Sequence, residues 1–270
     1  MLYLCATPIG NLEDMTFRAV RILREVDLIA AEDTRRTRKL LTHFDIHTPL
    51  IRFDENCKAS AAEKILQKLR AGESVAVVSD AGLPAICDPG ADLVRLAIDA
   101  GINVCPIPGA NAALSALICS GLDTSKFLFA GFAPKTKKNR RELLERLSTV
   151  EATIIFYEAP HRLKDFLAEL AEVFGERVAV LARELTKVHE EFLRGTLSEL
   201  IERLDEPRGE FVIIVEGNHK PPPLEDTPLD FYRKLLEQGL DKKSAMREAA
   251  KRFNVSRRDI YNTLLKEDTQ

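Results

Sequence analysis

The strongest constraint on the fold is an apolar run that stops abruptly in a loop of turn-forming residues. Residues 75–78 read Val-Ala-Val-Val, and the next twelve read Ser-Asp-Ala-Gly-Leu-Pro-Ala-Ile-Cys-Asp-Pro-Gly. We expect a buried strand over 74–79 and a helix over 89–100, which proline opens and Gly101 closes. Strand, loop and helix in this order predict a mostly parallel sheet covered by helices. Ligands of such sheets bind beyond the carboxyl ends of the strands.

The same alternation recurs along the chain, which indicates an α/β protein. In the first half, strands are expected over 2–7, 27–31 and 103–107, and helices over 14–26, 34–43, 60–71 and 109–119. The helix over 14–26 is amphipathic, with Phe17, Val20, Ile22 and Leu23 near one face. In the second half, strands are expected over 127–132, 153–157, 178–182, 211–216 and, at an edge, 189–194; helices are expected over 137–147, 160–174 and 197–204.

The pattern changes character near residues 115–125, where we place a domain boundary. It divides an N-terminal α/β domain (1–115) from a C-terminal α/β domain (116–219). Three consecutive prolines then predict a stiff linker over 220–227. Beyond it, short helices over 228–238, 242–253 and 256–265 resemble a helix-turn-helix module spanning 228–270. Ser256 and Asp259 have nearly the spacing and chemistry of a capping box.

Composition narrows the class of protein. Hydrophobic residues make up 45% and charged residues 30%, so the chain can bury a substantial core. The formal charge of −3 argues against a simple polycation that coats nucleic acid or membranes. Five scattered cysteines without C-x-x-C indicate reduced thiols in a cytoplasmic protein, and the histidines lack zinc-like spacing, so no metal site is expected. No apolar stretch approaches the length of a membrane span.

Three loops that follow strands are rich in glycine, alanine and proline: residues 6–12, 80–84 and 108–113. Small residues let the backbone approach a ligand closely, although tight helix–sheet packing uses the same residues. Gly109 is expected to begin a helix whose free N–H groups face the crevice. None of these loops holds a basic residue, so we expect a ligand with little phosphate charge, held by backbone, apolar contacts and an acid such as Asp80.

A second set of strand ends carries acids and bases together. These residues are Glu32, Asp33 and Arg35; Glu158, His161 and Arg162; and Arg183, Glu184 and Lys187. A helix cap or a surface ion pair would explain any one group, but three groups of the same composition suit proton transfer and phosphate positioning. Basic runs over 34–39 and 135–141 predict patches for a polyanion.

The motifs TPIGNL, AEDTR, SDAGLPAICDPG, PGANAALSAL, EAPHRL and RELTK occur in this order between residues 7 and 187, and the resemblance that they carry covers residues 2 to about 217. Together they resemble the tetrapyrrole methylase superfamily, and within it the branch that 2′-O-methylates a cytidine of 16S ribosomal RNA in the small subunit. The resemblance implies a homodimer with the fold of class III methyltransferases, in which two α/β domains hold S-adenosylmethionine in the cleft between them. The implied cofactor contacts are Pro8, Asp80, Leu83, Ile86, Asn111, Ala112, Tyr157, Ala182 and Phe211; Asn111 stands where the family motif usually has Ser or Thr.

Such a reaction needs a base for the ribose hydroxyl and cations for the flanking phosphates. The candidate bases are Glu158, His161 and Glu184, with Glu32 behind them. The candidate phosphate contacts are Arg35, Arg162, Arg183 and Lys187, together with Lys137, Lys138 and Arg140 of the second basic run. Two alternatives remain open: C-methylation of a corrinoid or sirohaem precursor on the same fold, and a non-catalytic RNA-binding or ribosome-assembly module. For the C-terminal helices, RNA contact and a docking or solubility role both remain open.

Overall fold

The computed structural model describes residues 1–219, 227–253 and 255–267. The chain divides into two compact units, Met1–Asn218 and His219–Gln270, which are described separately. The expected linker over 220–227 lies outside the described residues except for Thr227. Within the described residues, no helix is both long and apolar enough to cross a membrane.

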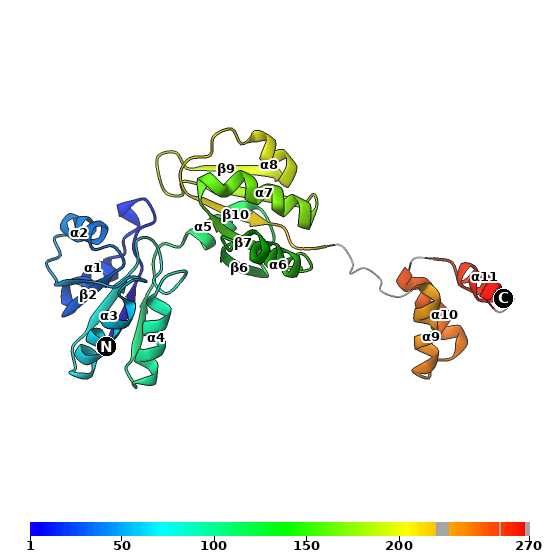
Figure 1. Ribbon diagram of the computed structural model, residues 1–270, viewed down its shortest axis with the longest axis horizontal. Coiled ribbons are helices and arrows are strands. Elements are labelled where there is room, and N and C mark those ends of the chain that lie inside the picture. The colour runs from blue at the N-terminus through cyan, green and yellow to red at the C-terminus, as the bar shows by residue number, and fades with distance from the viewer. Residues whose placement is uncertain (220–226, 254, 268–270) are drawn as a thin grey trace. The chain divides into compact units, whose positions relative to one another are not determined.

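The first unit begins with a sheet of order β3-β2-β4-β1-β5. All its strands are parallel, in agreement with the mostly parallel sheet predicted for this half. Helices flank this sheet in Figure 1. The strands are β1 (Leu2–Cys5), β2 (Leu28–Ala31), β3 (Leu50–Arg52), β4 (Val75–Val78) and β5 (Val104–Ile107). The helices are α1 (Phe17–Glu25), α2 (Thr34–His43), α3 (Lys58–Arg70) and α4 (Gly90–Asp99). Alternate strand residues pack against α1 and α2 on one face and against α3 and α4 on the other, which gives two separate cores.

Two expectations for this half were wrong. Strand β3 went unpredicted, since three residues are too few for a periodic signal. Phe17 does not face the core: it is 97% exposed, whereas Ala19, Ile22 and Leu23 are buried. Helix α1 begins at Phe17, after a 3₁₀ turn over Leu12–Asp14, and its buried row lies on the opposite side from Phe17.

The second sheet has the order β6-β7-β10-β8-β9 and is mixed rather than parallel. Only β6 and β7 run parallel, and every other pair is antiparallel. The strands are β6 (Phe127–Phe132), β7 (Thr153–Glu158), β8 (Val178–Arg183), β9 (Glu191–Thr196) and β10 (Phe211–Val215). The edge strand expected over 189–194 is indeed at an edge but begins two residues later.

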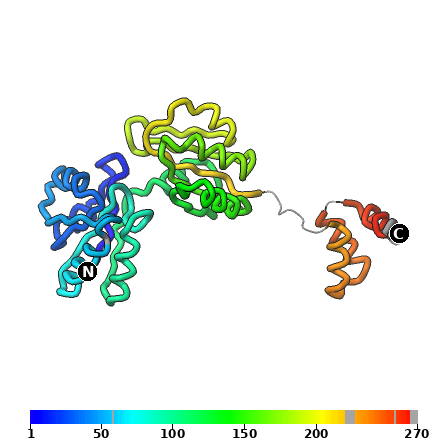
Figure 2. The backbone as a smooth tube through the Cα atoms, in the orientation of Figure 1, coloured from blue at the N-terminus to red at the C-terminus, as the bar shows by residue number. Residues whose placement is uncertain are grey.

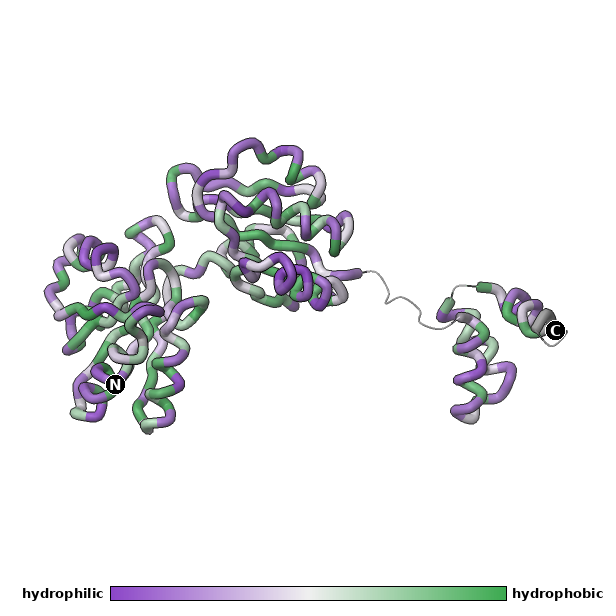
Figure 3. The backbone as a smooth tube through the Cα atoms, viewed as in Figure 1, coloured by the Kyte–Doolittle hydropathy of each residue, from purple (hydrophilic) through white to green (hydrophobic). Residues whose placement is uncertain are grey.

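Helices cover both faces of this second sheet. On one face lie α6 (Lys137–Leu147), α7 (Pro160–Phe174) and α8 (Leu197–Arg203). On the other lies α5 (Ala112–Ser120), through which the chain passes from β5 to the second sheet (Figure 2). In Figure 3 the strands are mostly hydrophobic, and hydrophilic residues gather on α2 and α6. Because α5 packs on the second sheet throughout, a division at 115/116 would cut through this helix; the domain limits remain a prediction.

The C-terminal unit contains three helices around a small apolar core. They are α9 (Pro228–Glu237), α10 (Lys242–Phe253) and α11 (Arg257–Glu267). Leu229, Tyr232, Ala245 and Ile260 are among its buried residues. The cap predicted before the last helix is confirmed, because Ser256 N donates to the Asp259 carboxylate and Asp259 N donates to Ser256 Oγ, both at 3.1 Å.

Candidate active site

A cavity of about 410 Å³ lies where the strand ends of the two sheets in Met1–Asn218 meet. The first sheet contributes Ile9, Glu32, Arg36, Ser79, Asp80, Ala81, Gly82, Leu83, Ile86, Cys87, Asp88, Asn111 and Ala112. The second contributes Phe132, Tyr157, Glu158, Ala159, Pro160, Ala182, Leu185, Glu210, Phe211 and Val212. Since β4, β1 and β5 are neighbours, the three small-residue loops lie side by side at one edge of the first sheet.

The loop after β4 is held in an unusual conformation by Asp88. Its Oδ1 accepts hydrogen bonds from Ala85 N at 2.9 Å and from Gly90 N at 2.7 Å. Ala85 and Cys87 both have positive φ, at 70° and 61°. Such strain is retained where surrounding contacts enforce it, often at binding sites. Burial raises the pKa of Asp88, whose Oδ2 is buried without a hydrogen-bond partner among the described residues.

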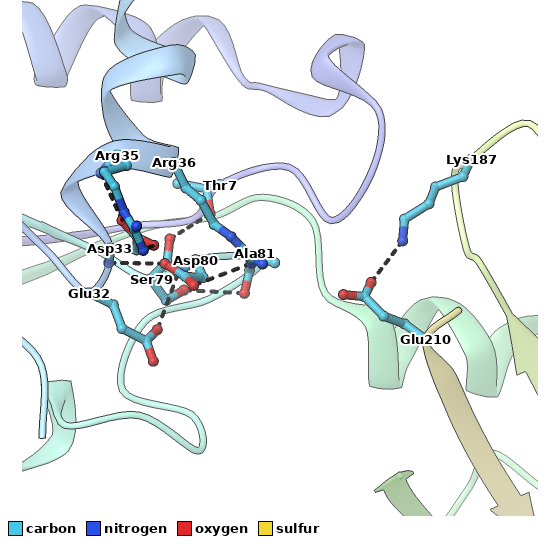
Figure 4. A network of polar contacts seen from close by, with 10 residues as sticks. All are labelled: Thr7, Glu32, Asp33, Arg35, Arg36, Ser79, Asp80, Ala81, Lys187 and Glu210. Atoms are coloured by element: carbon cyan, nitrogen blue, oxygen red, sulfur yellow. Dashed lines mark hydrogen bonds and ion pairs between the residues drawn. The ribbon is translucent and has the colours of Figure 1, made fainter. Parts of the chain in front are cut away.

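Asp80 joins this loop to the start of α2 (Figure 4). Its Oδ1 accepts from Asp33 N at 3.0 Å, and its Oδ2 lies 3.3 Å from Arg36 Nη1. Asp80 N in turn donates to Glu32 Oε2 at 3.3 Å. The carboxylate is therefore held from two sides by the segment that follows β2. Arg35 does not take part, since it pairs with the carboxylate of Asp33.

Eight of the nine residues carried over as cofactor contacts line the cavity; Pro8 instead lines a smaller neighbouring cavity. The expected helix start at Gly109 was wrong. Helix α5 begins at Ala112, and Asn111 caps it by accepting from Leu114 N at 2.9 Å. Gly109 serves close packing, because an added Cβ would lie 2.7 Å from Ala6 Cβ.

The structure brings two of the four candidate bases into the cavity and leaves two outside. Glu158 and Glu32 line it, and burial raises the pKa of Glu32. His161 is exposed and Glu184 does not reach the lining. Glu184 Oε1 accepts from Lys187 Nζ at 2.8 Å and from Glu210 N at 2.9 Å, and the bond from Lys187 lowers the pKa of Glu184. These positions speak against His161 and Glu184 as proton acceptors.

Glu158 ends β7 and has a side chain that is 0% exposed. Its Oε1 accepts from Ala159 N at 2.9 Å. Its Oε2 lies 3.3 Å from Arg162 Nη2 but makes no hydrogen bond among the described residues. Buried carboxylate oxygens are normally hydrogen-bonded, so this oxygen retains acceptor capacity that no hydrogen bond among the described residues uses.

The seven candidate phosphate contacts differ in exposure and in whether their charged groups already contact other parts of the protein. Arg35, Lys137 and Lys138 are exposed. Arg162 and Arg183 donate to backbone carbonyl oxygens, at Ala133 and Arg208 respectively. Lys187 pairs with Glu184 and Glu210; burial lowers the pKa of Lys187, but these two hydrogen bonds outweigh it and leave the pKa raised. Arg140 differs from the other six because it is held in an ion pair with Glu169.

Arg140 lies in a mostly buried ion pair, and its predicted contact with RNA stays a prediction. Its side chain is 12% exposed and donates from Nε and Nη2 to both carboxylate oxygens of Glu169, each at 2.6 Å. It also donates to the carbonyl oxygens of Pro134 and Lys135. Sequence alone presented it as one of five cations in a run, because the partner lies 29 residues away on α7.

We predict that Glu169→Ala lowers the free energy of unfolding by about 3 kcal/mol, because it leaves the buried Arg140 charge without its carboxylate. The control is Glu172→Ala, on the same helix α7 as Glu169. It breaks an exposed ion pair with Arg141 of α6 and should lower the free energy of unfolding by less than about 1 kcal/mol. Arg140 lowers the pKa of Glu169, so this stabilisation is present at neutral pH and is lost as the pH falls through that lowered folded-state pKa. Urea unfolding measures both variants, and equal losses would contradict the structural role.

Several residues that line the larger cavity were not predicted as site residues from the sequence. Arg36 was noted only as part of a basic run, and its pairing with Asp80 depends on β2 and β4 being neighbours. Asp88 lies within a quoted motif, and its spacing of two before Gly90 was the available signal for a capping role. No feature of the sequence marked Phe132 as a residue of the cavity. No group of three or more His, Cys, Asp or Glu among the described residues could hold a metal ion.

The structure is an α/β protein in which the strand ends of two sheets enclose one cavity. Residues 1–201 match the family described as Tetrapyrrole (Corrin/Porphyrin) Methylases. The chain belongs to this family, as its motifs predict. It is 51% identical over 269 residues to "Ribosomal RNA small subunit methyltransferase I" of Halalkalibacterium halodurans, covering 97% of this chain and 93% of that one. It is 48% identical to the Bacillus subtilis protein of the same name, with the same coverage.

Solved structures share the fold. A uroporphyrin-III C-methyltransferase from Thermus thermophilus, complexed with S-adenyl homocysteine, has a TM-score of 0.58 at 17% identity and covers 79% of this chain and 96% of its own. A diphthine synthase has a TM-score of 0.62 at 14% identity, and the match covers 80% of this chain and 89% of the synthase. The α/β fold expected from the sequence is therefore confirmed.

Proposed function

We propose that this chain transfers a methyl group from S-adenosylmethionine to the 2′-hydroxyl of a cytidine in 16S ribosomal RNA. The observation that carries the proposal is the charge of the cavity. Five carboxylates line it and Arg36 is the one cation among its described lining residues. Such a site suits a cationic sulfonium and opposes a triphosphate. Support for the RNA substrate comes from relatives named as ribosomal RNA methyltransferases, which align over 97% of the chain.

The residues present fit this cofactor. When bound, S-adenosylmethionine supplies a methyl group activated by a positively charged sulfur. Asp80 would accept hydrogen bonds from ribose hydroxyls, and Leu83, Ile86 and Phe211 would pack against the adenine. Asp88 Oδ2 and Glu158 Oε2 make no hydrogen bond among the described residues, so both keep acceptor capacity for a ligand, although Oε2 also lies 3.3 Å from Arg162 Nη2.

Glu158 is the proposed proton acceptor. Oε1 of its buried carboxylate accepts from Ala159 N, whereas Oε2 lies 3.3 Å from Arg162 Nη2 without a hydrogen bond and is proposed to accept from the substrate hydroxyl. Arg162 is itself fixed by the carbonyl oxygens of Ala133 and Pro134. Holding the acceptor hydroxyl near the methyl group would provide much of the acceleration. Glu32, on the opposite lobe, adds negative charge beside Asp80.

The test is methyl transfer by the purified protein. Labelled S-adenosylmethionine is incubated with small ribosomal subunits from a strain that lacks the gene. We expect label in 16S RNA, and nuclease digestion with mass spectrometry should place it on the ribose of a cytidine. Label on a tetrapyrrole precursor instead would favour the C-methylation alternative. Cofactor binding without any transfer would favour a non-catalytic binding module.

The C-terminal helices are proposed to contribute RNA contacts. Between residues 242 and 258 the one acidic residue is Glu248, and the basic residues are Lys242, Lys243, Arg247, Lys251, Arg252, Arg257 and Arg258. These lie on α10 and at the start of α11, and the described side chains among them are exposed. A local basic surface of this kind attracts RNA although the whole chain is slightly acidic.

We predict that Lys242→Gln/Lys243→Gln weakens binding to small subunits and makes the slope of log affinity against log salt shallower by about 1.4, or about 0.7 for each lost contact with single-stranded RNA. The control Lys64→Gln/Lys126→Gln removes the same charge from exposed sites on the first unit. Filter binding at several salt concentrations measures both. Equal slopes in the two variants would favour a docking role instead.

Two further expectations from the family resemblance remain predictions. The protein is proposed to be a homodimer, which sedimentation equilibrium would test. It is proposed to act in the cytoplasm, where its ribosomal substrate occurs, and cell fractionation would test this.

A further inference from the structure

We infer that a second, smaller cavity beside the first is a subsite for one phosphodiester group of the RNA, held by Arg36 and Lys39. This cavity measures about 230 Å³ and shares Arg36, Ser79 and Asp80 with the larger one as a common wall. The inference rests on the proposed function and names the site that the RNA backbone requires.

The chemistry of a ribose demands such a site. The 2′-hydroxyl sits on the carbon next to the one that carries the 3′-phosphate, so an anion must lie close to the methyl acceptor. The larger cavity is unsuited to it, because Glu32, Asp80, Asp88, Glu158 and Glu210 all line that space. Uncompensated like charges would repel a phosphate there. The phosphate therefore belongs in an adjoining space with cations.

The smaller cavity has that character. Arg36 and Lys39 line it, and Asp80 is the one acidic residue among its described lining residues. The two cations are three residues apart on α2, so they project from the same side of the helix. Gly10 forms another part of the lining and lies against a third cation: a Cβ added there would meet Lys187 Cγ at 2.6 Å.

Arg36 is placed to serve both cavities (Figure 4). One of its terminal nitrogens lies 3.3 Å from Asp80 Oδ2, while its side chain remains 66% exposed. A guanidinium has five N–H donors in a rigid fork, so it can hold Asp80 and still bind a phosphate. Lys39 is exposed and adds a second positive charge, whereas the ion pair with Asp80 is made by Arg36.

The test compares Arg36→Gln, Lys39→Gln and the double variant with Arg38→Gln. Arg38 lies on the same helix, is exposed and lines neither cavity, so it controls for loss of charge from α2. We expect the double variant to make the salt slope of small-subunit binding shallower by about 0.7, the value for one lost phosphate contact, and each single change to make it shallower by less. The Arg38 change should leave the slope as in the parent protein. Calorimetry with S-adenosylmethionine should give the same dissociation constant for Lys39→Gln and the parent, which places its defect on the RNA side.

Salt slopes for the double variant that match those of Arg38→Gln would overturn the phosphate subsite while leaving the proposed function intact, provided the parent protein methylates RNA. A weaker cofactor affinity in Lys39→Gln, with unchanged RNA binding, would likewise overturn it and assign the cavity to the cofactor. Failure of the parent protein to bind or methylate small subunits would overturn the proposed function and the subsite together.

Discussion

Glu158→Gln should slow methyl transfer by about 10²–10⁴-fold, the usual contribution of a positioned general base. Glutamine keeps the shape of the side chain, and its oxygen can still accept from Ala159 N, but the amide cannot take a proton from the ribose hydroxyl. The affinity for S-adenosylmethionine should change little, because the proton is lost only during transfer. Single-turnover transfer to small subunits, with cofactor in excess, measures this rate directly.

The matched control for this experiment is Glu202→Gln, an exposed residue of α8 outside the cavity, which should transfer at the parent rate. Arg162 retains its bonds to Ala133 and Pro134 in the Glu158 variant, so the fold should persist, and thermal unfolding checks this. A rate within a few-fold of the parent would remove general-base catalysis from the account and leave positioning as the source of acceleration.

Asp80→Ala should weaken S-adenosylmethionine binding by about 10–100-fold, which corresponds to the loss of hydrogen bonds to a charged group worth about 1.5–3 kcal/mol. The change also leaves Asp33 N and Arg36 without the acceptor that joins the loop to α2. Asp80→Asn keeps an acceptor for Asp33 N and should show a smaller loss. Isothermal titration calorimetry measures the dissociation constants.

Asp99→Ala serves as the comparison for the Asp80 variants, since Asp99 is exposed at the far end of α4 and lines none of the described cavities. Its affinity should equal that of the parent. If Asp80→Ala bound as tightly as Asp99→Ala, the cofactor would have to occupy another part of the chain, and the assignment of the β4 loop would be lost.

The apolar runs of the sequence predicted at which edge of the first sheet the site lies, because parallel strands bring their carboxyl ends to the same edge. The runs ending at Thr7, Val78 and Ile107 are apolar on both faces, which is typical of strands in a parallel sheet. In such a sheet, the loops that follow these strands must lie at the same edge, as they do here. Likewise, Glu158 could be chosen from its place at the end of a buried strand. Helices with clear caps, such as Thr34–His43 and Pro160–Phe174, agree with the expected limits residue for residue.

What sequence could not supply is the pairing of charged side chains across the fold. Arg140 and Lys187 both read as free cations, yet one lies in a buried pair with Glu169 and the other joins Glu184 to Glu210. In the sequence, Arg36 is one member of a basic run. It can pair with Asp80 only because β2 and β4 are neighbours in the sheet. Glu184 lies only three residues before Lys187, but Glu169, Glu210 and Asp80 lie more than 20 residues from their cations, and such pairs depend on topology that no local periodicity encodes.

The central claim is that the acid-lined cavity between the two sheets binds a sulfonium nucleoside. Calorimetric titration of the full chain with S-adenosylmethionine tests this most directly, with circular dichroism confirming that the protein is folded. The account predicts saturable heat with S-adenosylmethionine and with its demethylated product. The absence of heat with both ligands from the folded protein would contradict it.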